Sequence, residues 1–104
     1  KKEGTLVEPN DDLEQLRLRI DQIDVRLLEI LAERMSVVRQ IGSHKKENGM
    51  TLLQIDRWND IFENQLRNGL SLGLSESMIQ DLYRLIHLES IQTQERIIRG
   101  SNEV

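Results

Sequence analysis

The sequence predicts an all-α fold with three helices per protomer, one of them very long, assembled as an intertwined homodimer. The first observation behind this prediction is the composition, which has many Leu, Ile, Glu, Arg and Gln residues, one residue each of Trp, Tyr and Phe, and a single proline. The second is that the apolar residues recur at helical spacing rather than sparsely, which also disfavours disorder. The third is the length of the first periodic segment, because the rest of so small a chain cannot cover the apolar face of a helix that long.

The composition also narrows the function. A chain of 104 residues forms one domain at most, and its net charge of −4 disfavours a general nucleic-acid binder, although a local cluster of Arg and Lys can still bind a small anion. The lack of cysteine excludes disulfides and thiolate metal sites. No apolar run approaches the ~20 residues of a membrane span and no signal peptide is visible, so we expect a cytoplasmic protein without membrane contact. The start at Lys1-Lys2, without a methionine, suggests a piece of a longer polypeptide.

The first helix is predicted from Leu13 to about Glu47, after a linker or disordered tail over residues 1–12 in which Asn10, Asp11 or Asp12 provides the N-cap. Its apolar residues form one stripe with alternating spacings of three and four: Leu13, Leu16, Ile20, Ile23, Leu27 and Ile30. At ~1.5 Å per residue the helix would be ~50 Å long. Asn48-Gly49 is predicted to end it, because both residue types tolerate a left-handed C-cap.

A cation interrupts this stripe. Val37 and Ile41 continue the rhythm inward, but the position between them and Ile30 is Arg34, and Lys45 follows eleven residues later on nearly the same face. A guanidinium at a seam position is costly to bury unless an anion meets it, so the two cations suggest an anion site. The alternative, in which Arg34 reaches the surface and Lys45 is solvated, stays open on this pattern alone.

Two shorter helices are predicted after Gly49. The second runs from Thr51 to about Asn68, with a capping box formed by Thr51 and Gln54, and its predicted inward residues are Ile55, Trp58, Phe62 and Leu66. Gly69 and Gly73 are expected to bracket a short loop. Ser75 caps the third helix, with Leu74 and Ile79 as a hydrophobic staple. Its predicted core residues are Ile79, Leu82, Ile86, Thr93 and Ile97, and residues 100–104 are expected to fray.

The long helix predicts the dimer. Two shorter helices cannot cover its whole stripe, and a soluble monomer rarely leaves such a stripe in water. A two-fold partner that packs its own long helix against this one is the simplest remedy. Arg17, ~25 Å before Arg34, cannot reach the same pocket from its own helix, but an antiparallel partner helix could bring it there.

The remaining candidates are polar. His87, Ser90 and Gln94 share one face of the third helix, and Arg57 lies near the start of the second. A polar ledge between helices and an ordinary surface arginine are the plain alternatives. His44 and His87 lack metal-ligand spacing, and no phosphate loop or nucleophile motif is visible. Permanent cations with neutral hydrogen-bonding groups suit a reaction that holds a dianion in a strained shape.

These segments resemble a known family. The stretches LRLRIDQIDVRLLEILAERMSVVRQIG, HKK, QIDRW and LESIQTQ resemble the all-helical class of chorismate mutases over about Leu13 to Ile98. The resemblance implies a homodimeric isomerase of aromatic amino-acid biosynthesis, in the shikimate pathway, with two equivalent sites. It would convert chorismate to prephenate by an intramolecular Claisen rearrangement, without cofactor or metal. The mutase-like domain would span residues 13–99.

The resemblance also implies residue roles. Arg34, and Arg17 from the other subunit, would bind substrate carboxylates, Ser90 would contact a carboxylate, and Arg57 would help to fix the substrate. Lys45 and Gln94 would donate to the ether oxygen. Three pocket positions depart from the pattern: Trp58 replaces a glutamate that binds the substrate hydroxyl, Gln54 replaces an aspartate, and His87 replaces an aliphatic residue.

Other readings remain open. Members of the family are also fused to prephenate dehydratase, prephenate dehydrogenase or DAHP synthase, and the linker-like start suggests a mutase domain from a DAHP synthase fusion. An isochorismate-pyruvate lyase would use nearly the same cations. A regulatory or dimerisation module that controls a fused enzyme would explain Trp58. A coiled-coil adaptor would leave Arg34 on the seam unexplained.

Overall fold

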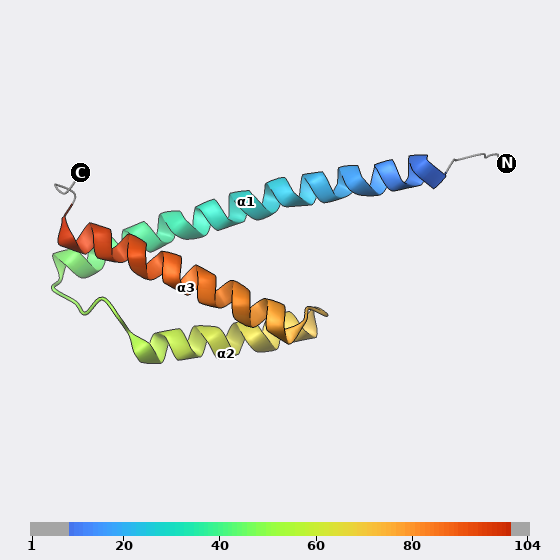
Figure 1. Cartoon of the computed structure of the whole chain (residues 1–104). Coiled ribbons are helices and arrows are strands. Elements are labelled where there is room, and N and C mark those ends of the chain that lie inside the picture. Colours follow the sequence, from blue (N-terminus) through green and yellow to red (C-terminus); the bar gives the residue numbers. More distant parts are fainter. Residues whose placement is uncertain (1–8, 101–104) are drawn as a thin grey trace. The chain divides into compact units, whose positions relative to one another are not determined.

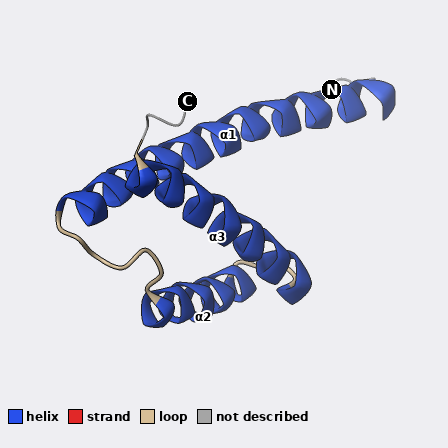
Figure 2. Ribbon diagram, turned by 60° about the vertical axis from the view of Figure 1, so that its left-hand side comes forward, coloured by secondary structure: helices blue, strands red, loops and turns tan. Residues whose placement is uncertain are grey.

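The computed structural model describes residues 9–100, and over this range it contains three helices and no strand. They are α1 (Pro9–Glu47), α2 (Ile55–Ser71) and α3 (Glu76–Arg99), shown in Figures 1 and 2. The predicted all-α fold is therefore confirmed. The chain divides between Arg34 and Met35, inside α1, into two compact units, which we describe separately.

The start of α1 differs from the prediction. The helix begins at Pro9, so Asn10, Asp11 and Asp12 lie inside the helix and none of them is its N-cap. Proline is favoured in the first turn because its missing N–H would have no helical partner there, and acidic residues in this turn interact favourably with the helix dipole. The part of the predicted tail that precedes Pro9 lies outside the described residues.

In the first unit, the predicted apolar stripe of α1 is open to solvent in the single chain. Its six members are between 43% and 63% exposed: Leu13, Leu16, Ile20, Ile23, Leu27 and Ile30. Leu18 and Val25 are also more than half exposed, at 52% and 55%. Burial of such side chains is worth about 1.5–3 kcal/mol each, so this helix leaves a large stabilisation unused in an isolated chain.

In the second unit, α1 buries a face next to the predicted one. Val38 and Gly42 are buried, whereas Val37 and Ile41 are about half exposed, so the predicted inward pair is wrong for the single chain. The reason is the close approach of α3. A Cβ atom on Gly42 would lie 3.3 Å from the Cα atom of Gln94, so only a residue with very little bulk fits at this crossing.

The end of α1 follows the prediction. Gly49 has a φ of 62°, and the amide of Met50 donates to the carbonyl of Lys45 at 2.9 Å. The side chain of Asn48 donates to the carbonyl of His44 at 2.8 Å, and the amide of Gly49 donates to the carbonyl of Lys46 at 3.4 Å, so these carbonyls of the last turn have partners. The loop to α2, drawn in tan in Figure 2, follows directly.

Helix α2 begins later than predicted, at Ile55. The capping box is not formed, because the amide Nε2 of Gln54 donates to the carbonyl of Thr51 at 3.0 Å and Gln54 caps the helix without a side-chain bond. Ile55 is 60% exposed, so its predicted inward position is wrong for the single chain. Trp58, Phe62 and Leu66, the other three predicted inward residues, are half-buried.

Helices α2 and α3 form a hairpin and pack side by side (Figure 1). Gly69 was predicted in the connecting loop but lies inside α2, buried against Ile79, and a Cβ atom there would approach Ile79 Cγ1 within 2.8 Å. The left-handed position that ends α2 is instead Gly73, with a φ of 88°. The packing of Ile79 on a bare backbone therefore explains the glycine at position 69.

The start and core of α3 are mostly as predicted. Ser75 Oγ accepts from the amide of Met78 at 3.1 Å, which confirms the predicted cap. Ile79 is 3% exposed and Thr93 is buried, whereas Leu82 is 40% exposed and its predicted core position is wrong for the single chain.

Candidate functional site

Lys45 and Gln94 form the centre of the candidate site. The ammonium Nζ of Lys45, in the last turn of α1, donates to Gln94 Oε1 on α3 at 2.8 Å. It also donates to the backbone carbonyl of Leu52, in the loop before α2, at 2.7 Å. One cation thus joins the end of α1, the loop and α3 within the second unit.

The local fold explains this meeting. Gly42 lies one turn before Lys45 and allows the backbone of α1 to approach Gln94. The capped end of α1 then turns the chain so that Leu52, which is half-buried, presents its carbonyl to the ammonium. The position of the cation is therefore fixed by two acceptors from separate segments.

The two bonds also determine which donors stay available. An ammonium carries three N–H groups, and the bonds to Gln94 and Leu52 use two of them. Because Oε1 of Gln94 accepts, its Nε2 group is turned away from the cation with two further N–H donors. Gln94 is 7% exposed, and burial lowers the pKa of Lys45 below its ordinary value. Donors in such a partly desolvated place interact more strongly with a partial negative charge.

Ser90 extends this polar row along α3. Its hydroxyl donates to the carbonyl of Ile86 at 2.7 Å, and the residue is 8% exposed. In this rotamer the hydroxyl proton is used within the helix. Ser90 and Gln94 are one turn apart, so their side chains lie on one face of α3.

His87, one turn before Ser90, stacks on Trp58 of α2. Their ring centroids are 3.8 Å apart with planes inclined by 21°, and Phe62 meets the indole at 5.5 Å and 50°. Burial lowers the pKa of His87 below its ordinary value, so its imidazole is neutral near pH 7. The second unit thus combines a cation, an amide, a hydroxyl and an aromatic pair.

The remaining predicted site residues are divided between the two units. Arg57 and Gln54 are exposed at the start of α2. Arg34, which is half-buried, and Arg17 belong to the first unit, whereas Lys45 and Gln94 belong to the second. Arg17 is exposed, and its guanidinium lies 4.0 Å from the carboxylate of Glu14. Such a surface ion pair contributes little to stability, so Arg17 could exchange it for another anion at a small cost in free energy.

Two features of the site carried no recognisable signal in the sequence. A backbone acceptor such as the carbonyl of Leu52 has no residue type of its own, and its role depends on the path of the loop. The contact between Trp58 and His87 joins residues that are 29 positions apart in the sequence. The sequence marked each of them as unusual but did not indicate that they pair. Gly42 did offer a hint, since glycine in the interior of a helix usually has a packing reason.

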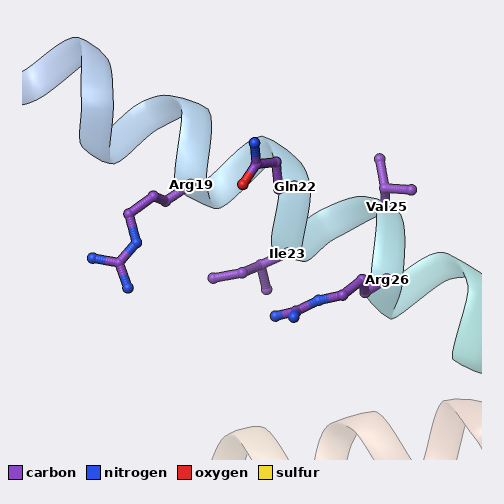
Figure 3. A pocket seen from close by; sticks show the side chains of 5 residues that line it. All are labelled: Arg19, Gln22, Ile23, Val25 and Arg26. Carbon is purple, nitrogen blue, oxygen red and sulfur yellow. The ribbon is translucent and has the colours of Figure 1, made fainter.

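A hollow in the first unit lies elsewhere. All five of its lining residues come from α1: Arg19, Gln22, Ile23, Val25 and Arg26. Arg19, Ile23 and Arg26 extend to one side of the helix, and Val25 extends to the other (Figure 3). None of the five is a predicted site residue.

Two other kinds of site are absent from the described part of the chain. Among residues 9–100 no group of three or more His, Cys, Asp or Glu side chains could hold a metal ion. No helix in the same range is long and apolar enough to span a bilayer.

Comparison with known proteins connects this arrangement to a family. Residues 16–95 match the family described as chorismate mutase type II. The chain is 30% identical over 90 residues to the bifunctional chorismate mutase/prephenate dehydratase of Buchnera aphidicola subsp. Acyrthosiphon pisum (strain APS), covering 86% of this chain and 23% of that protein. It is 31% identical over 84 residues to the protein of the same name from Escherichia coli (strain K12), covering 81% and 22%.

A shorter relative is named for a different substrate from that of the two bifunctional proteins. The 4-amino-4-deoxychorismate mutase of Streptomyces pristinaespiralis is 26% identical over 88 residues, covering 85% of this chain and 68% of that protein. By contrast, the chain covers less than a quarter of the length of each of the two bifunctional relatives.

Proposed function

From the membership of this chain in the chorismate mutase type II family, we propose that it converts chorismate to prephenate by a cofactor-free Claisen rearrangement. The observation that carries the proposal is the Lys45–Gln94 pair, because its bonds within residues 9–100 use two of the three ammonium N–H groups and only the oxygen of the Gln94 amide. The reaction needs no nucleophile or acid-base pair from the enzyme. It needs a compact substrate conformer and donors where charge develops.

The donors act on the ether oxygen. As the C–O bond of the ether breaks and a C–C bond forms within the same molecule, electron density shifts onto this oxygen. The third N–H of Lys45 and the Nε2 group of Gln94 would donate to it. Such donors bind the transition state more tightly than the ground state, and one of them is worth ~3 kcal/mol on the scale of oxyanion-hole donors.

The arginines hold the two carboxylates. We assign Arg34 to one carboxylate and Arg17 of a second copy to the other, with Arg57 helping to fix the substrate and Ser90 contacting a carboxylate. Bonds from Arg to a carboxylate are directional and bidentate, so they select the compact, chair-like conformer. Gln54 and Trp58 provide no carboxylate for the substrate hydroxyl, so turnover by this chain alone is expected to be slow.

The second copy follows from the exposed stripe of α1. A homodimer with antiparallel α1 helices would cover the apolar residues from Leu13 to Ile30 and bring Arg17 of one chain towards Arg34 of the other. Neither chain would then hold a complete set of carboxylate-binding residues by itself. The dimer is therefore part of the proposed active site and not only a source of stability.

A longer polypeptide is also part of the proposal. The relatives that combine a mutase with prephenate dehydratase are more than four times as long as the matched segment, so such chains join two activities. We propose that this domain, over residues 13–99, acts in the cytoplasm beside a second enzyme of aromatic biosynthesis, with DAHP synthase as the candidate.

The test follows the loss of chorismate absorbance with the parent chain, Arg34→Ala and Lys45→Ala, and with Lys46→Ala as the control. Lys46 is exposed and adjacent in sequence, so its removal changes the net charge equally. We expect conversion to prephenate by the parent and the control, and a loss of about a hundredfold for each of the other two. An inert parent that binds prephenate would be a regulatory domain, and conversion of isochorismate to salicylate and pyruvate would identify a lyase.

A further inference from the structure

The stacked rings of Trp58 and His87 form an aromatic surface between α2 and α3. The centroid distance of 3.8 Å and the inclination of 21° are those of a face-to-face stack, and the Phe62 ring lies with its centroid 5.5 Å from that of the indole. Both Trp58 and His87 are half-buried, so part of this surface stays open.

Its place on α3 relates it to the polar row. His87, Ser90 and Gln94 are spaced at i, i+3 and i+7 and lie on one face of the helix. At 1.5 Å per residue, His87 and Gln94 are separated by about 10 Å along the axis, which suits one small ring that carries carboxylates. Lys45 binds at the Gln94 end, so the row is cationic at one end and aromatic at the other.

The aromatic end carries no charge near pH 7. Burial lowers the pKa of the His87 imidazole, and an indole does not ionise. The faces of aromatic rings have a negative quadrupole, so they repel a carboxylate and accept the edge or face of an unsaturated ring. A substrate whose ether oxygen meets Lys45 and Gln94, as proposed above, would therefore place its uncharged ring towards the stack and its carboxylates away from it.

We propose that the Trp58–His87 stack is a specificity-determining wall of the site, which binds the unsaturated ring of the substrate by face and edge contact. The inference rests on the proposed function and goes further, since it assigns recognition of the ring to two uncharged aromatic residues. The wall contacts the ring in the ground state and in the transition state alike. It therefore acts on KM and has little effect on kcat.

Kinetics of matched variants test the wall. Trp58→Leu and His87→Leu keep an apolar side chain but remove the ring pair, and each is expected to raise KM by about tenfold with kcat within about twofold. His87→Phe keeps a stack and should retain most of the affinity. His44→Leu is the control, because His44 is the other histidine of the chain and lies exposed at the end of α1. Circular dichroism would check that each variant retains its helices.

Fluorescence gives an independent readout, because Trp58 is the only tryptophan in the chain. Its emission should change saturably on addition of prephenate, at the concentrations that inhibit turnover, and the change should be lost in His87→Leu. Such a change in a chain without turnover would uphold the wall and overturn the proposed catalysis. Turnover by the parent with unchanged KM in both Leu variants and no emission change would overturn the wall and leave the proposed function intact. An inert chain whose emission ignores prephenate would overturn both.

Discussion

Lys45 Nζ and Gln94 Oε1 are 2.8 Å apart, although 49 positions separate the two residues in the sequence. The bond does more than join α1 to α3. Because the amide oxygen of Gln94 faces the ammonium, the amide N–H groups face elsewhere, and each partner fixes the direction in which the other donates. The pair therefore behaves as one unit with a cationic and a neutral donor.

Replacement of Gln94 by Glu tests the neutral donor. An ionised carboxylate accepts but cannot donate, so Gln94→Glu is expected to lose about a hundredfold in kcat/KM at pH 7. Protonation restores a donor, and the adjacent ammonium holds the carboxyl pKa below the usual ~4.3, so activity should return only in acid. A pH–rate profile measures this, with Gln94→Ala as the control that should lose activity without acid recovery. A profile for Gln94→Glu that is flat with pH would contradict the donor role.

The pH dependence of the parent chain tests the cationic donor. Burial lowers the pKa of Lys45 from 10.5, so the ammonium form and the activity should decline with rising pH below that value. The same shift affects stability. Between the lowered pKa and 10.5 the unfolded chain binds more protons than the folded chain, so the contribution of Lys45 to the free energy of unfolding rises with pH in that window.

The alkaline limb of kcat/KM measures the lowered pKa. Lys45→Arg keeps a positive charge to much higher pH, and any activity that it retains should lack this limb. An alkaline limb that is the same in the parent and in Lys45→Arg would assign the titration to another group.

Gly69→Ala tests the close packing of α2 on α3. Intrinsic helix propensity alone would stabilise the protein by up to about 1 kcal/mol, but the new Cβ atom would approach Ile79 Cγ1 within 2.8 Å. Overpacking of this kind typically destabilises by about 1–3 kcal/mol, which would lower Tm by several degrees. Thermal unfolding followed by circular dichroism shows whether Tm falls or rises. Ile79→Val removes Ile79 Cδ1, the atom nearest to the new Cβ atom, so the double variant should recover part of the lost stability. A Tm of Gly69→Ala above that of the parent would refute the argument.

Mixed dimers test the donation of Arg17 across the proposed interface. Arg17→Ala and Lys45→Ala should each be nearly inactive alone. If each site takes Arg17 from one chain and Lys45 from the other, a mixed dimer has one site with both defects and one intact site. An equal mixture after subunit exchange should then regain about a quarter of parental activity. No recovery, with exchange verified by mass-tagged chains, would place both residues in the same chain's site.

The sequence predicted local features well because their causes are local. The end of α1 at Gly49 and the start of α3 at Ser75 depend on conformations that a few neighbouring residues dictate. Gly69 was misjudged because its role depends on Ile79, which only the hairpin brings near. Val37, Ile41 and Leu82 follow the apolar rhythm, yet the single chain leaves them about half exposed.

For the site as well, local features were predictable and contacts between distant segments were not. Lys45 and Gln94 were singled out by their chemistry and by resemblance, but their direct bond required the crossing at Gly42. The carbonyl of Leu52 was not predictable, since any residue could supply it. What the sequence lacked in both cases was the path of the chain between helices.

The separation of 49 positions between Lys45 and Gln94 also has a consequence for the order of folding. The α2–α3 hairpin is closed by the short connection around Gly73, whereas the Lys45–Gln94 bond closes a loop that includes the whole of α2, at a higher entropic penalty. We therefore expect helical structure to return before the donor pair in a refolding experiment. Recovery of catalysis would then report the final closure of the chain, and a lag behind the circular dichroism signal would measure how late that closure occurs.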